Sequence, residues 1–336
     1  MNEGSQGLDR VASMLRNADA VVVAASNGFD IADGYNQFAC DREFLQVFGD
    51  FNQTFGLTSI LQGLMAQWPS WQTRWAFLAR LVEYGWQSYR PSPAMQALDA
   101  LTRGKPRFVI TCNCNGRFER AGFDANALFE TEGSFVRLRC SAACSDECYD
   151  AVPFVERIVG QTEEGFAKVD RADVGRDAKT PGTARVHDST DAHGCIEVPE
   201  ALIPRCPHCG APLDVAVDDT GALARTAQFQ KQQARFQSFL EAHKNERILI
   251  LELGMGQRNP AIKRPLMAFA EAAPNSSYVV INREPAILPA IPAARIASVE
   301  GDLSEALSAL CELASEGPAS QSGETQRVAR VGEVHL

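Results

Sequence analysis

The apolar residues of this 336-residue chain fall into short, unbroken runs that are separated by helical patterns. The runs predict buried strands at residues 20–25, 108–110, 247–253, 277–281 and 296–299. The segments between them predict helices at residues 8–16, 95–101, 229–243 and 304–313. Because strands alternate with helices, the pattern predicts an α/β fold in which a parallel sheet carries helices on both faces.

The section from residue 38 to residue 89 is rich in aromatic residues and predicts a helical insertion. Its large apolar side chains recur every three or four positions, which is typical of one face of a helix. They are Trp68, Trp71, Trp75, Leu78, Val82 and Trp86. The pattern favours a buried core face, and the alternative is a lid or a wall of a substrate groove.

Polar loops follow the predicted strands, at residues 26–34, 111–116 and 254–260. Small residues in the first loop let the backbone approach a ligand, and the start of the next helix favours a phosphate. An ordinary strand-to-helix turn is the alternative, because the loop is not a GxGxxG. Cys112 and Cys114 are interpreted as pocket-lining residues, because nothing beside them in the sequence activates a thiol. Parallel strands end at one edge of a sheet, so we expect these loops to meet there.

Cysteines occur in pairs at the spacing of metal ligands, Cys140 with Cys144 and Cys206 with Cys209. Four thiolates suit a tetrahedral, structural Zn²⁺. Three alternatives stay open: Cys148 in place of Cys144, His208 as a ligand, and a set of unrelated reduced cysteines. A disulfide framework is disfavoured, because the chain is long and no export signal is visible. The polar segment 161–192 between the two pairs predicts a surface excursion.

Composition and charge exclude several classes of function. The net charge is −10 and the isoelectric point is about 5.1, which argues against nucleic acid or an anionic membrane as the main partner. No apolar run approaches the roughly 20 residues that span a bilayer. Residues 1–9 are polar and lack the apolar centre of a signal peptide. We therefore predict a cytoplasmic protein.

Taken in order, these features resemble those of the sirtuins, and most closely those of the macrodomain-linked class M branch. The resemblance is carried by AGFDANALFETEGSF before the first cysteine pair and by LELGMGQRNPAIKRP, VVINRE and EGDLSEAL near the end. It covers residues 8–313 and implies Rossmann-like parts at 8–37, 94–132 and 225–313. It further implies a helical insertion at 38–93, a zinc module at 133–224 and a disordered tail at 314–336.

The resemblance implies that NAD is bound and consumed as a co-substrate. In the family, the first loop wraps the pyrophosphate, Asn113 matches an asparagine that orients the nicotinamide ribose, and the late loops hold the adenosine. The residues that it places around NAD are Ser26, Asn27, Gly28, Gly34, Asn113, Asn115, Gly254, Met255, Gly256, Asn259, Arg264, Asn282, Arg283 and Asp302.

This sequence departs from the family pattern at several of these positions. Asp30 stands in place of a serine, where an inward-facing carboxylate would repel a diphosphate. Asn115 replaces the usual aspartate, and residues 35–38 replace a proline-aspartate-phenylalanine-arginine run that helps to bind nicotinamide. The usual catalytic histidine falls at Glu132, where the class M branch has a glutamine.

A glutamate changes the chemistry that we expect. Its ordinary pKa lies about two units below that of a histidine, so it is a weaker base at neutral pH. It is better suited to stabilise the positive charge that builds as nicotinamide leaves. We therefore predict a mono-ADP-ribosyltransferase in which Glu132 and Asn113 are catalytic. The alternatives are an NAD-dependent protein-lysine deacylase and a degenerate protein that only binds NAD or ADP-ribose. The implied partners are a protein substrate, with a lipoyl-carrier protein as one candidate, and a macrodomain hydrolase of the same pathway.

Overall fold

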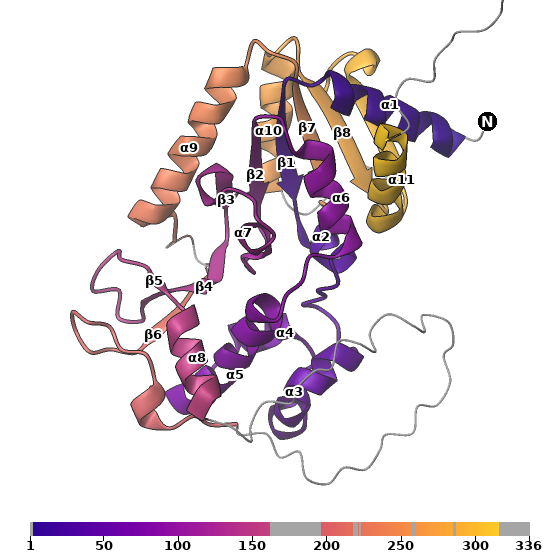
Figure 1. The fold of residues 1–336 in the computed structure, drawn as a ribbon. Coiled ribbons are helices and arrows are strands. Elements are labelled where there is room, and N and C mark those ends of the chain that lie inside the picture. The colour runs from indigo at the N-terminus through magenta and orange to yellow at the C-terminus, as the bar shows by residue number, and fades with distance from the viewer. Residues whose placement is uncertain are drawn as a thin grey trace, which may run out of the picture.

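A six-stranded parallel sheet forms the larger part of the molecule (Figure 1). The computed structural model describes residues 3–161, 196–217, 221, 223–256, 260–284 and 287–315. The strands are β1 (Ala20–Ala25), β2 (Arg107–Thr111), β3 (Leu128–Glu130), β7 (Ile248–Leu253), β8 (Ser277–Asn282) and β9 (Ile296–Glu300). They lie in the order β3-β2-β1-β7-β8-β9, and all neighbours run parallel. The order reverses between β1 and β7, which is where ligands bind in open sheets of this kind.

Helices cover both faces of the sheet, as the sequence predicts (Figure 1). On one face lie α1 (Glu3–Asn17), α6 (Pro93–Thr102) and α11 (Leu303–Ser315). On the other lie α9 (Ala227–His243) and α10 (Pro260–Ala272). The strands in the middle of the sheet are buried along their whole length, because each face is covered by a hydrophobic cluster.

The helical insertion consists of α3 (Arg42–Phe55), α4 (Ile60–Met65), α5 (Trp71–Val82) and a π-helical turn at Glu83–Gln87. The prediction that residues 68–86 share one helical face is wrong for Trp68, which lies in the loop before α5. The interpretation of the stripe as core is confirmed at Trp75, which is fully buried, whereas Trp68 and Trp71 are only partly buried. Serine caps at Ser59 and Ser70 fix where α4 and α5 begin.

The cysteine-bearing part is a small antiparallel sheet in the order β5-β4-β6, with α8 (Val152–Gln161) packed nearby. Its strands are β4 (Gly133–Cys140), β5 (Tyr149–Asp150) and β6 (Leu213–Val217). Phe135, Leu138 and Cys140 share one hydrophobic cluster with Trp75 and with Phe77 of the helical insertion. The indole nitrogen of Trp75 also donates to the carbonyl of Leu213 at 3.0 Å. The helical insertion and the cysteine-bearing sheet therefore stabilise each other as one packed unit.

Two predicted segments fall largely outside the described residues. The excursion predicted at 161–192 is described only at residue 161, which ends α8. Residues 314 and 315, expected to begin the tail, belong to α11, and 316–336 lie outside the described residues. In the ranges that are described, no helix has both the length and the apolar character of a membrane span.

Candidate active site and metal centre

A cleft of about 510 Å³ opens at the carboxyl edge of the large sheet, where the strand order reverses. Its walls come from the loops after β1, β7 and β8 and from the turn between β3 and β4. The lining residues are Ser26, Asn27, Gly28, Glu132, Gly254, Gly256, Asn282, Arg283 and Glu284. The volume lies in the range of small-molecule sites. The structure thus brings together residues that are more than 250 positions apart, and all of them except Glu284 are among the predicted site residues.

Two glycines let the loops after β1 and β7 touch each other at the bottom of the cleft. The amide of Gly28 donates to the carbonyl of Gly254 at 3.0 Å. A Cβ atom on Gly28 would lie 2.6 Å from that carbonyl oxygen, and one on Gly254 would lie 2.4 Å from the amide nitrogen of Phe29. Gly254 also has a positive φ of 60°, which side chains disfavour. Backbone therefore forms this part of the cleft floor.

Asn113, at the end of β2, supports the first loop from below. It is buried, and its side-chain amide donates to the carbonyl of Ser26 at 3.2 Å. The hydroxyl of Ser26 lies 3.0 Å from the thiol of Cys112. Neither Cys112 nor Cys114 is among the residues that line the cleft, and burial raises the pKa of Cys114. Both cysteines are therefore packing residues below the site.

Glu132 lies in the turn between β3 and β4 and is among the residues that line the cleft. The residue is exposed, but the protein around its carboxyl group still removes part of its hydration. This desolvation raises the pKa of Glu132 above its ordinary value. The carboxylate is therefore a stronger base than a fully hydrated glutamate.

Asp30 does not line the cleft, so the expected repulsion of a diphosphate does not arise. It is only 4% exposed, in the short helix α2 (Asn27–Ala32). Burial raises the pKa of Asp30 to about 7, against the opposing effects of Arg117 and of the Asn115 and Asn113 amides. Arg117 in turn forms an ion pair with Asp33 at 3.3 Å. A buried polar cluster thus lies behind the cleft, and local sequence gave no sign of it.

One buried donor beside this polar cluster, the hydroxyl of Tyr35, has no hydrogen-bond partner within the described residues. The side-chain oxygen of Asn115 accepts from the amide of Arg117 at 3.1 Å. An unpartnered buried hydroxyl is uncommon in a folded core and indicates a place where water or a ligand can bind.

The remaining predicted cofactor residues that the structure describes are not among those that line the cleft. Asp302 pairs with Arg283 at 2.8 Å, and Arg283 is 73% exposed at the rim. Gly34 ends α2 with a positive φ of 79°. Met255 is fully buried under the loop that it belongs to. Asn259 falls outside the described residues.

Arg264, which was predicted to bind the cofactor, is not among the residues that line the cleft. Arg264 is exposed on α10, whereas Lys263 is buried and pairs with Glu252 of β7 at 2.8 Å. The hydroxyl of Tyr278 donates to the same carboxylate at 2.6 Å. This triad fixes the first turn of α10, and thus the end of the glycine loop before it. The signal in the sequence was Glu252, a carboxylate inside an otherwise apolar strand.

The four predicted metal ligands come together at one end of the small sheet. The thiol sulfurs of Cys140, Cys144, Cys206 and Cys209 all lie within 4.8 Å of one another. Two sulfur pairs are 3.5 Å apart, close to the roughly 3.8 Å of a tetrahedral Zn²⁺ with 2.3 Å bonds. Backbone amides help to lower the pKa of Cys140 to about 6, which favours the thiolate. The set can hold Zn²⁺, and neither Cys148 nor His208 belongs to it.

Comparison with solved structures identifies the fold. A Sir2 homologue in complex with NAD matches with a TM-score of 0.52, over 92% of this chain and 94% of its own, at 15% identity. A Sir2 homologue mutant in complex with 2′-O-acetyl ADP-ribose gives a TM-score of 0.54, over 96% and 100%, at 16% identity. The chain has the sirtuin fold. The cleft lies at the carboxyl edge of the parallel sheet of this fold.

Two curated proteins with similar sequences are named as ADP-ribosyltransferases. A Staphylococcus aureus protein named "Protein ADP-ribosyltransferase" is 24% identical over 330 residues, which cover 98% of this chain and 94% of that protein. A Fusarium oxysporum protein named "Probable bifunctional ADP-ribose hydrolase/ADP-ribosyltransferase" is 27% identical over 272 residues. That match covers 78% of this chain and only 39% of the relative. No protein-family model matches the sequence.

Proposed function

We propose that this protein is an NAD-dependent mono-ADP-ribosyltransferase that modifies a protein acceptor and releases nicotinamide. The observation that carries the proposal is the position of Glu132, a carboxylate of raised pKa in the wall of the cleft at the switch point of the sheet. The names of the two curated relatives support the same reaction.

The lining residues fit NAD at both ends of the cleft. Gly256 lines the cleft with open space around its Cα, which leaves room for the phosphates, and Arg283 lies at the rim, where it can face the adenosine. Asn282 and Glu284 supply polar groups for ribose hydroxyls. NAD supplies a glycosidic bond that is already activated by the positive charge on its nicotinamide ring.

Glu132 is then the group that favours cleavage of this bond. In the reaction, the bond between the ribose carbon and the nicotinamide nitrogen breaks, and its electron pair leaves with nicotinamide. A side-chain atom of the acceptor forms the new bond to the same carbon, and the proton of that atom is released to solvent as nicotinamide leaves uncharged. A carboxylate beside that carbon stabilises the positive charge in the transition state, and it can hydrogen-bond a ribose hydroxyl.

One observation favours protein-lysine deacylation as a second candidate. Partial desolvation brings Glu132 closer to the basicity of the histidine that deacylating sirtuins use. A carboxylate acts as base or charge stabiliser only when it is ionised. Both candidates therefore predict that activity is lost as the pH falls through the raised pKa of Glu132.

The proposal also covers the partners and the location of the enzyme. The acceptor is a protein, with a lipoyl-carrier protein as the candidate that the sequence suggested, and a macrodomain hydrolase would reverse the modification. The bifunctional name of the Fusarium relative supports this pairing of hydrolase and transferase. The nine described cysteines, all of them free thiols, are in keeping with the predicted cytoplasmic location.

Nicotinamide release from NAD tests the proposal. Wild type, Glu132→Gln and Glu284→Gln are compared with and without a lysate of the source cell. Glu132→Gln should lower acceptor-dependent release by roughly 10²–10³-fold, while Glu284→Gln, in the loop after β8, should mainly raise the KM for NAD. Equal release by wild type and Glu132→Gln would overturn the proposal.

A further inference from the structure

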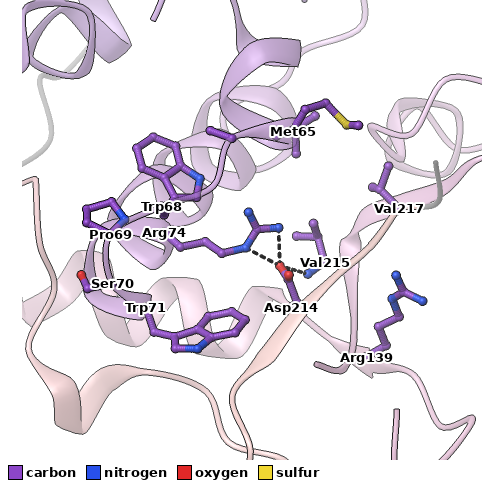
Figure 2. Close-up of a pocket in the computed structure, with 12 residues that line it drawn as sticks. Met65, Trp68, Pro69, Ser70, Trp71, Arg74, Arg139, Asp214, Val215 and Val217 are labelled. Atoms are coloured by element: carbon purple, nitrogen blue, oxygen red, sulfur yellow. Dashed lines mark hydrogen bonds and ion pairs between the residues drawn. The ribbon is translucent and has the colours of Figure 1, made fainter. Parts of the chain in front are cut away.

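A second cavity, of about 530 Å³, lies between the helical insertion and the cysteine-bearing sheet (Figure 2). Its helical wall is made by Met65, Trp68, Trp71 and Arg74, and its other wall by Asp214, Val215 and Val217 of β6 and by Arg139 of β4. None of these residues lines the cleft that contains Glu132. The cavity is therefore a separate site that the proposed reaction leaves unused.

The apolar part of this cavity continues onto the surface of the helical insertion. Met65 is 53% exposed, and Leu61 and Phe55 are each 37% exposed. The Phe55 ring packs edge-on against Trp68, with ring centroids 5.4 Å apart. Exposed apolar side chains next to partly buried tryptophans are typical of protein interfaces.

The polar part of the cavity carries more positive than negative charge. Arg74 is held by Asp214, whose carboxylate oxygen lies 2.8 Å from two of its nitrogens, and the same oxygen accepts from the amide of Val215. Figure 2 shows Trp68 and Trp71 on either side of this fixed guanidinium. Among the described residues, Arg139 has no ion-pair partner. Two arginines thus face one carboxylate, in a chain whose net charge is −10.

We propose that this cavity is a docking site for the protein acceptor, and that it binds a segment in which apolar side chains alternate with carboxylates. The apolar side chains contact Trp68, Trp71 and Met65, while the carboxylates pair with Arg139 and with the free edge of Arg74. Buried tryptophan and arginine contacts of this kind dominate binding energies at interfaces. Because the rest of the protein surface is acidic and repels carboxylates, a local positive site also determines where such a segment binds.

The distance to the cleft determines what docking contributes, and this step rests on the proposed function. Glu132 directly precedes β4, and Arg139 is near the end of that strand. Seven residues of extended strand span roughly 20 Å. Docking therefore adds affinity away from the reacting atoms, so that loss of the site raises the KM for the acceptor with little effect on kcat.

Peptide binding in the absence of NAD tests the docking site independently of the transferase activity. The probes are a synthetic ten-residue peptide that alternates glutamate with leucine and a matched peptide that alternates lysine with leucine. Binding is followed by the change in intrinsic tryptophan fluorescence, to which Trp68 and Trp71 in the cavity wall contribute. We expect saturable binding of the glutamate peptide only, and weaker binding at high salt because charge pairs are screened.

Arg139→Glu is the decisive variant, and Arg157→Glu on the exposed surface of α8 is the control with the same charge change. Arg139→Glu should weaken binding at least about tenfold, which is about 1.4 kcal/mol, while Arg157→Glu binds as wild type. Melting temperatures of both variants verify that they are folded. No binding of the glutamate peptide, equal binding of both peptides, or equal loss in the two variants would overturn the proposal.

Discussion

Replacing Asp30 by asparagine should make the protein more stable at neutral and alkaline pH. Burial raises the pKa of Asp30 from 3.8 to about 7, so the folded state holds this proton more tightly than the unfolded state does. The folded state therefore loses stability as the pH rises from about 4 to 7, and the whole cost is present above pH 7. A pKa difference of this size corresponds to roughly 4 kcal/mol, which is an upper bound. Asp30→Asn keeps the shape of the side chain and removes that cost.

Urea unfolding at pH 8 and at pH 5, followed by tryptophan fluorescence, measures this effect. The gain in the free energy of unfolding should be a few kcal/mol at pH 8 and clearly smaller at pH 5. The control is Asp9→Asn on the exposed surface of α1, which should change little at either pH. A destabilised Asp30→Asn at pH 8, or a gain that does not depend on pH, would refute the reasoning. Slower nicotinamide release by the stabilised variant would indicate that the carboxylate is kept for function at the expense of stability.

Three further predictions concern a glycine of the cleft, a buried ion pair and the metal. Gly254→Ala should weaken NAD binding strongly, since its Cβ would lie 2.4 Å from a backbone nitrogen, whereas Gly49→Ala, in α3 and with open space around its Cβ, should bind NAD as wild type does; isothermal titration with NAD separates the two. Lys263→Met should cost about 3–5 kcal/mol in urea unfolding, because it leaves the carboxylate of Glu252 buried without its cation, and an unchanged midpoint would contradict the pairing. Cys209→Ser should lower the zinc content measured by atomic absorption and also the melting temperature, because the small sheet shares its core with the helical insertion; full zinc content in the variant would exclude this thiol as a ligand.

The large sheet could be predicted from the sequence because its strands are buried on both faces and therefore read as continuous apolar runs. β3 was missed, since three residues are too short to show a pattern. The small sheet was missed for another reason. β4 and β6 pair across more than 70 residues, without the short turn that marks a hairpin. Their pairing follows from the shared core with Trp75, which no local signal reveals.

The cleft residues in loops that follow strands could be predicted from the sequence. The residues on helices could not, because the rotation of the helix decides which side chains face inward. The residues after β1, β7 and β8 meet in the cleft because parallel strands end at one edge. Whether Lys263 or Arg264 faces inward depends on the rotation of α10 against β7. The pKa of Asp30 depends on the groups packed around it. The docking cavity is likewise formed by segments that are remote in the sequence.

Following the adenylate half of NAD tests the central claim most directly. NAD labelled in its adenylate group is incubated with lysate of the source cell and with either wild type or Glu132→Gln. ADP-ribosyl transfer predicts that wild type moves the label onto protein in step with nicotinamide release, and that Glu132→Gln loses both. Nicotinamide release with all of the label in small molecules would contradict a transferase and leave deacylation. No release at all from a protein that still binds NAD would contradict an enzymatic role for Glu132.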